Sequence, residues 1–230
     1  MTLLIPDVDD RGDLGTFVGR AVRLDPAATV RLRVTPGGRV TVWATTPFDV
    51  LATRSVPGSL DPDDVTAPAI ALLTALSVER AAAVDPGVGG LWQGLLPPDA
   101  GWTAVDSVPA AELEVLTERG LALARENAGP LGPPASLLDQ TVLTVTGPAA
   151  GPPSPRTSTS STRGPADGPH PTAATVKVPL RCLFALSGMG FLGAGADDET
   201  VRVSATSSWL RLDARYGAVV RRRLTALPLL

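Results

Sequence analysis

The chain has 230 residues, 44% of them hydrophobic, and a formal net charge of −3, so it can form one large or two small domains around an apolar core. No apolar run approaches the ~20 residues of a transmembrane helix, and the N-terminus lacks the basic and apolar regions of a signal peptide, so we expect a cytoplasmic protein. The single cysteine, Cys182, excludes an intramolecular disulfide and a cysteine-only metal site.

The first hundred residues predict a small antiparallel β-meander followed by a helix. Apolar and polar residues alternate over 29–35 and again over 39–45, with Pro36-Gly37-Gly38 as the turn of a hairpin. Strands over 17–24 and 50–56 complete the meander. A helix capped by Thr66, with Pro68 in its first turn, ends before Asp85, and residues 91–102 are expected to form an ordered loop.

The rest of the chain predicts a second α+β unit with a disordered insert. The insert, residues 147–174, is rich in Pro, Ser and Thr and has no hydrophobic periodicity. The expected elements around it are helices over 109–127, 136–139 and 176–191 and strands over 141–146, 200–205 and 209–213. This order matches a winged helix. We therefore predict an α+β protein with an antiparallel sheet and helix domain over 1–104 and a winged-helix-like domain over 105–230. No internal repeat is visible in the sequence.

Several short motifs point to a family. They are Pro97-Pro98 with Gly101-Trp102 in the first half and, in the second, 137–145, Val178-Pro179-Leu180-Arg181, Met189-Gly190-Phe191-Leu192, Trp209 and Tyr216-Gly217. In these motifs the chain resembles a family of uncharacterised actinobacterial proteins of this length. The resemblance spans most of the chain outside the insert. Because no activity is established for that family, the resemblance implies no functional residues.

Three features that suggest chemistry lack the context that the chemistry needs. The segment Gly188–Gly193 has the spacing G-x-G-x-x-G, but it closes a predicted helix instead of opening one after a strand, so it does not predict nucleotide binding. His170, the only histidine, lies in the insert, where no partner can hold it for catalysis. Cys182 lies in an apolar helix, where an inert thiol is expected. We predict no catalytic or cofactor-binding residues.

Acidic residues cluster at 7–10, 61–64 and 197–199. Paired carboxylates can hold a divalent ion or act as acid and base. Each cluster, however, lies in a predicted loop beside Pro or Gly, where aspartate serves turns and helix caps. Solvated loops are therefore expected, and no metal ligands are predicted.

Charge is unevenly distributed along the chain. Residues 1–147 hold ten arginines against eighteen acidic residues, a net charge of −8, whereas residues 176–230 have a net charge of +4. Five arginines of the second region could contact nucleic acid from the wing of a winged helix: Arg211, Arg215, Arg221, Arg222 and Arg223. The alternative is a solvated edge strand that uses charge to prevent pairing.

The sequence favours a non-enzymatic binding or scaffolding protein with an unknown protein partner. Its predicted contact residues are the tryptophans Trp43, Trp92 and Trp102, which can anchor an interface when exposed. The first alternative is a regulator that binds nucleic acid through the basic C-terminal domain. The second is a carboxylate- or metal-dependent enzyme. The oligomeric state is left open.

Overall fold

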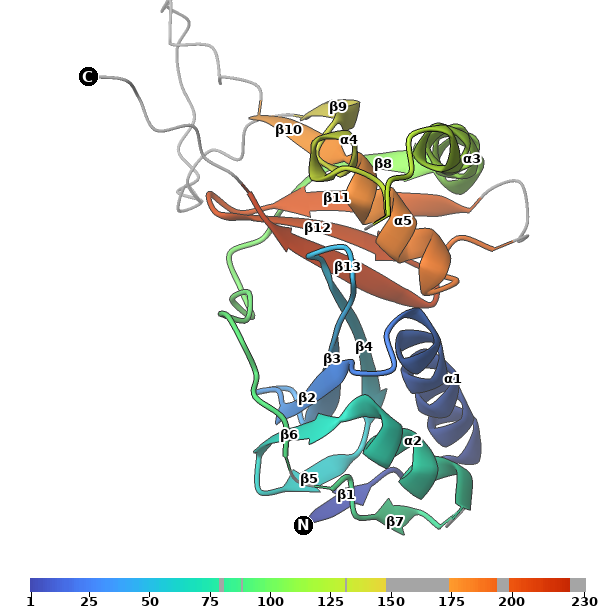
Figure 1. The fold of residues 1–230 in the computed structure, drawn as a ribbon. Coiled ribbons are helices and arrows are strands. Elements are labelled where there is room, and N and C mark those ends of the chain that lie inside the picture. The colour runs from blue at the N-terminus through green and yellow to red at the C-terminus, as the bar shows by residue number, and fades with distance from the viewer. Residues whose placement is uncertain (79–80, 88, 131, 148–173, 194–198, 224–230) are drawn as a thin grey trace, which may run out of the picture.

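An eight-stranded antiparallel sheet runs through the computed structural model and contains strands from both halves of the chain (Figure 1). The structure describes residues 1–78, 81–87, 89–130, 132–147, 174–193 and 199–223. The N-terminal half contains β1 (Thr2–Leu4), α1 (Val8–Leu24), β2 (Thr29–Val34), β3 (Arg39–Thr45), β4 (Leu51–Pro57), β5 (Ser59–Asp61), β6 (Asp64–Pro68), α2 (Ala69–Val78) and β7 (Ala83–Val84). The C-terminal half contains β8 (Thr103–Pro109), α3 (Ala110–Glu126), α4 (Ala135–Leu138), β9 (Thr141–Gly147), β10 (Ala174–Pro179), α5 (Leu180–Gly188), β11 (Thr200–Ala205), β12 (Trp209–Ala214) and β13 (Gly217–Arg222).

The two halves meet at the centre of this sheet. Its strand order is β6-β2-β3-β4-β13-β12-β11-β8, and β4 pairs with β13 through Thr53↔Ala218, Ala52↔Val219 and Leu51↔Val220. Cross-strand partners share a face of the sheet. A row of buried residues therefore crosses the central pair on one face: Ala44, Ala52, Val219, Leu212 and Val203. One hydrophobic core thus extends beneath both halves.

Each half of the chain contains the same two structural units, but the units follow one another in opposite order. The succession strand-helix-three strands occurs as β1-α1-β2-β3-β4 and again as β10-α5-β11-β12-β13. A shorter strand-helix-strand unit follows the first as β6-α2-β7 and precedes the second as β8-α3-β9. Counted outward from the centre, β4-β3-β2-β6 corresponds to β13-β12-β11-β8, which gives the sheet an approximate twofold symmetry. The repeat is one of structure, since no repeat is visible in the sequence.

The predicted strand over residues 17–24 is wrong, because these residues are the second half of α1. Asp7 caps this helix, since its carboxylate accepts hydrogen bonds from the amides of Asp9 and Asp10 at 2.8 and 3.0 Å. Leu14, Phe17, Val18 and Ala21 are buried at helical spacing. The prediction covered only the second half of this helical pattern and did not recognise Asp7 as the N-cap.

The predicted apolar helix over 176–191 divides into a strand and a helix at Pro179. Val176 and Val178 are buried while Thr175 and Lys177 are exposed, which is the alternation of β10. Pro179 has extended backbone angles (φ −80°, ψ 154°), and α5 begins at the next residue. In the N-terminal half, likewise, residues 64–68 form β6, so that α2 begins only at Ala69.

The winged-helix expectation is wrong for two physical reasons. A winged helix needs a helix with an accessible face, whereas every residue from Leu180 to Leu186 in α5 is buried. Its wing would also be a small separate hairpin, whereas β11, β12 and β13 belong to the eight-stranded sheet. The antiparallel hairpin of β2 and β3 is confirmed, as are α3, α4 and β9 within one residue at each end.

Two smaller sheets lie beside the large one. One has the order β5-β1-β7, and the other is the two-stranded β9–β10 ribbon. Residues 148–173 of the predicted insert lie outside the described residues; its flanks, Gly147 and Ala174, pair at the end of the ribbon. Among the described helices, none has the length and apolar character needed to cross a membrane.

Candidate functional site

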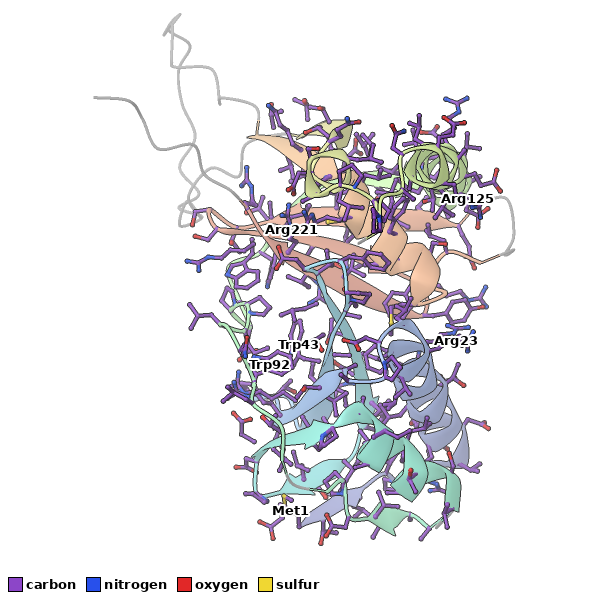
Figure 2. The ribbon with its side chains drawn as sticks, viewed as in Figure 1. Met1, Arg23, Trp43, Trp92, Arg125 and Arg221 are labelled. Atoms are coloured by element: carbon purple, nitrogen blue, oxygen red, sulfur yellow. The ribbon has the colours of Figure 1, made fainter. Side chains whose placement is uncertain are left out.

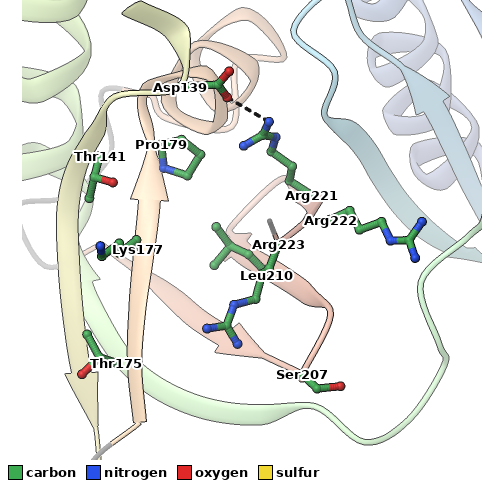
Figure 3. Close-up of a pocket in the computed structure, with 10 residues that line it drawn as sticks. All are labelled: Asp139, Thr141, Thr175, Lys177, Pro179, Ser207, Leu210, Arg221, Arg222 and Arg223. Atoms are coloured by element: carbon green, nitrogen blue, oxygen red, sulfur yellow. Dashed lines mark hydrogen bonds and ion pairs between the residues drawn. The ribbon is translucent and has the colours of Figure 1, made fainter. Parts of the chain in front are cut away.

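The main candidate site is a pocket of about 500 Å³ between the β9–β10 ribbon and the end of β13 (Figure 3). Thr175 and Lys177 of β10 line one side, because the alternation of the strand turns them away from the core. Arg221, Arg222 and Arg223 approach from the last strand of the sheet. The pocket is thus built from elements that lie apart in the sequence and carries a concentration of positive charge.

Arg221 belongs to an ion network of two nearly buried arginines and two more exposed aspartates at the top of the pocket (Figure 3). Its Nη2 donates to Asp139 Oδ1 at 2.9 Å, and Nη2 of Arg181 lies 2.9 Å from the second oxygen of the same carboxylate. Asp49 Oδ2 lies 3.6 Å from both guanidinium groups. The side chains of Arg181 and Arg221 are only 8% and 11% exposed, so the two acids compensate charges that burial would otherwise penalise.

The same network joins the two halves of the chain. Asp49 and Phe48 lie in the loop between β3 and β4, whereas Arg181 is the second residue of α5. Nη1 of Arg181 donates to the carbonyl of Phe48 at 2.9 Å, and the Phe48 ring meets Phe184 edge-on, with 5.9 Å between centroids. Asp49 has φ of 55°, a left-handed conformation that aspartate tolerates better than most residues. The loop is therefore held in place by the C-terminal half.

The other cations of the pocket have fewer partners. Within the described ranges, Lys177 and Arg222 take part in no ion pair, and Arg223 donates through Nη1 to the carbonyl of Thr206 at 2.8 Å. Figure 3 shows Arg223 extending toward the β9–β10 ribbon and Arg222 pointing away from it. The Nε of Arg221 has no hydrogen-bond acceptor among these residues, but it is closed to solvent and does not open into the pocket. The donor left unused at the pocket is therefore the ammonium of Lys177.

The five arginines predicted to contact nucleic acid do not form one surface. Arg221–Arg223 lie together, but Arg215 lies at the opposite end of the β12–β13 hairpin. Arg215 pairs with Glu199 at 2.6 Å, and this hydrogen bond raises the pKa of the guanidinium. Arg211 donates to Asp213 at 2.7 Å and lies over the ring of Trp102, 5.9 Å from its centroid. The five arginines are close in the sequence, but the β12–β13 hairpin places Arg215 and Arg221–Arg223 at opposite ends.

The tryptophans predicted as protein contacts differ in accessibility. Figure 2 labels two of them, Trp43 on β3 and Trp92 in the connection between the halves. Trp43 is only 6% exposed, so the expectation that it presents its ring to a partner is wrong. Trp92 and Trp102 are partly exposed, in the connection between the two halves and at its end. Their role as contacts stays a prediction.

The remaining chemical features occupy structural positions. Cys182 is buried, and burial raises the pKa of its thiol to about 12. Gly188 ends α5 and Gly190 has φ of 60°, as expected for a helix C-terminus. Asp64 accepts two hydrogen bonds from Arg31, which lowers the pKa of the carboxyl. His170, Asp197 and Asp198 lie outside the described residues. Within the described part, no three His, Cys, Asp or Glu side chains gather in a way that could hold a metal.

The sequence reading missed Lys177, Asp139 and Asp49. Lys177 was not predicted as a site residue because residues 176–191 were assigned to one apolar helix. Reading Thr175 to Val178 as a strand would have placed its side chain on the solvated face. Asp139 and Asp49 carry no local signal, because each derives its role from arginines more than forty residues away.

The helices carry no excess of positive charge. α1 contains three aspartates and three arginines, α2 has no charged residue, and α3 contains four glutamates and two arginines. α5 contributes only the buried and paired Arg181. A surface built from these helices would not attract phosphate strongly.

Two family models match successive parts of the chain, and the one that covers more than half of it shows that the chain belongs to an uncharacterised family. A family model described as "Domain of unknown function (DUF8185)" matches residues 97–226, and one described as "Domain of unknown function (DUF8010)" matches residues 1–93. These matches confirm the resemblance to an uncharacterised family. No curated protein matches the sequence.

The fold, by contrast, is found in solved structures of DNA sliding clamps. The DNA polymerase sliding clamp from Caulobacter crescentus is 18% identical, with a TM-score of 0.54 over 99% of this chain and 67% of that chain. The sliding clamp from Bacillus subtilis is 12% identical, with a TM-score of 0.53 over 98% and 64%. A structure of Caulobacter crescentus pol III beta is 16% identical, with a TM-score of 0.52 over 96% and 65%. The chain thus spans about two thirds of each clamp chain.

This similarity overturns the function expected from the sequence. The sequence predicted a scaffolding protein with an unknown partner, with a winged-helix regulator or a carboxylate- or metal-dependent enzyme as alternatives. These predictions assumed an architecture that the chain does not have. The clamp fold covers nearly the whole chain instead, including the pocket and the seam between the halves.

Proposed function

We propose that this chain, which belongs to the family described as "Domain of unknown function (DUF8185)", is a DNA-clamp-like protein that acts as an assembly of more than one copy. The observation that carries the proposal is the similarity in fold to sliding clamps over 96–99% of the chain. In this role its partners are DNA and proteins that act on DNA.

The continuous sheet supports the proposal, because a clamp must keep its shape while it surrounds a duplex. The halves are joined by main-chain pairing of β4 with β13 and by a common core, not by a flexible linker alone. The ion network of Arg181, Asp139, Arg221 and Asp49 adds a second junction. A hinge at this seam would have to break both sets of contacts.

The edges of the small sheet support assembly from several copies. In the described part of the chain, the outer edges of β5 and β7 pair with no further strand. Unpaired edges are ready sites for pairing with another chain. Closed symmetry is the usual result when identical chains assemble.

The charge of the helices indicates how such a protein would stay on DNA. With three acidic and three basic residues on α1 and an excess of acid on α3, the helices offer little counterion release. Retention would therefore depend on closure around the duplex. Affinity for linear DNA should be low.

Sedimentation equilibrium across a wide range of protein concentrations tests the assembly. We expect a single closed oligomer with a fixed number of chains in exchange with the monomer. Open-ended growth would indicate contacts that do not close. A monomer at every concentration, with and without circular DNA, would contradict the proposal.

A further inference from the structure

We infer that the pocket between the β9–β10 ribbon and the end of β13 is a binding site for a phosphate group on a small organic molecule. The inference does not depend on the clamp-like function, because it is drawn from the lining of the pocket alone. The inference rests on three features that occur together in this pocket: positive charge, hydroxyl groups and a concave shape (Figure 3).

The charge of the pocket favours an anion. Arg221 is compensated by Asp139 and Asp49, but Lys177 and Arg223 line the pocket without an ion pair within the described ranges. Arg222, which also forms no ion pair there, lies at the edge of the pocket and points away from the ribbon. A dianion such as phosphate would restore the balance.

Several exposed donors face the pocket. Thr141 and Thr175 lie on the β9–β10 ribbon with the ammonium of Lys177, and the hydroxyl of Ser207 lies on the opposite side of the pocket (Figure 3). Phosphate oxygens accept several such hydrogen bonds at once, and the bonds are strong because the acceptor is charged.

Size and shape favour a small molecule over a nucleic-acid strand. The volume of about 500 Å³ lies within the range of roughly 300–1,000 Å³ found for small-molecule sites. Leu210 and Pro179 supply an apolar part of the lining, against which the organic part of a ligand can pack. A duplex, whose phosphates lie on a convex surface, cannot bring them into such a pocket.

Calorimetric titration of the full chain with inorganic phosphate and with ATP, at matched ionic strength, tests the inference. We expect binding of both, tighter for ATP. Lys177→Gln and Arg223→Gln should each weaken it by about tenfold or more, because each removes a charged donor. Lys177→Arg keeps the charge and should bind within a few-fold of the parent, which separates loss of binding from misfolding.

Arg202→Gln is the matched control. Arg202 lies on β11 of the same sheet, its side chain is 63% exposed, and it does not line the pocket. Its removal should leave binding unchanged. A short single-stranded oligonucleotide serves as the third ligand. The inference is overturned if phosphate and ATP do not bind, if the control weakens binding equally, or if only the oligonucleotide binds through Lys177 and Arg223.

Discussion

Asp139 lies where two arginines meet, and this position determines what the neighbouring cations can do. Its two carboxylate oxygens engage Arg181 and Arg221, each at 2.9 Å. The carboxylate is 39% exposed, whereas both arginines are nearly buried. The acid therefore holds Arg221 at the top of the pocket and compensates a charge that solvent reaches poorly.

Asp139→Asn should destabilise the protein by about 1–3 kcal/mol, because it removes the charged acceptor of two buried arginines and leaves the shape unchanged. Urea denaturation followed by circular dichroism measures the effect. Asp99→Asn, an exposed aspartate without an ion pair among the described residues, is the control and should change stability by less than about 0.5 kcal/mol. Equal stabilities of the two variants would show that the network contributes nothing.

Cys182 should resist alkylation in the folded protein. Its thiol is buried with a pKa of about 12, and the thiolate is the form that reacts. The folded state keeps a proton that the unfolded chain releases above about pH 8.5, so stability should fall as the pH rises beyond that value. Cys182→Ala should remove this part of the alkaline loss. Rapid labelling of the native chain by iodoacetamide would contradict the assignment.

At the scale of elements, local signals predicted the hairpin and tertiary contacts decided the rest. The alternation around Pro36–Gly38 predicted β2 and β3 almost residue for residue. The helix predicted over 176–191 was wrong because the alternation of Val176, Lys177 and Val178 is too short to distinguish a strand from the start of an apolar helix. Only the pairing of β10 with β9 distinguishes them. The pocket could not be predicted for the same reason, since it needs β10 to be a strand beside β13.

The β9–β10 ribbon is positioned by a close approach at Gly147. A Cβ at this residue would overlap the backbone carbonyl oxygen of Val105 in β8, which cannot move aside as a flexible side chain can. Gly147→Ala should therefore cost about 1–3 kcal/mol and should also weaken phosphate binding, because the ribbon forms one wall of the pocket.

Gly15→Ala is the matched control for this change. Gly15 lies within α1, and an added Cβ meets no atom within 4 Å. Replacing a helix-interior glycine by alanine should raise stability by about 0.5–1 kcal/mol. Thermal unfolding of both variants measures the contrast. A Gly147→Ala protein as stable as the parent would show that β9 and β8 can separate without cost.

At the scale of the molecule, the repeated unit explains why a chain with no visible sequence repeat has an approximately symmetric sheet. The two arms, β4-β3-β2-β6 and β13-β12-β11-β8, need only similar patterns of burial, not similar residues. They share one core, so neither arm should be stable alone. We expect far-UV circular dichroism and tryptophan fluorescence to give coincident urea transitions. Two separated transitions would show that the halves fold independently.

Retention on circular DNA tests the clamp-like function most directly. The protein is mixed with linear duplex, the DNA ends are then ligated to form circles, and the complex is washed at high salt, so that no separate loading factor is needed. Because the helices lack excess positive charge, we expect the protein to leave linear DNA, to remain on the circles, and to be released when a restriction enzyme cuts them. Equal loss from circular and linear DNA would contradict the proposal that this protein closes around DNA.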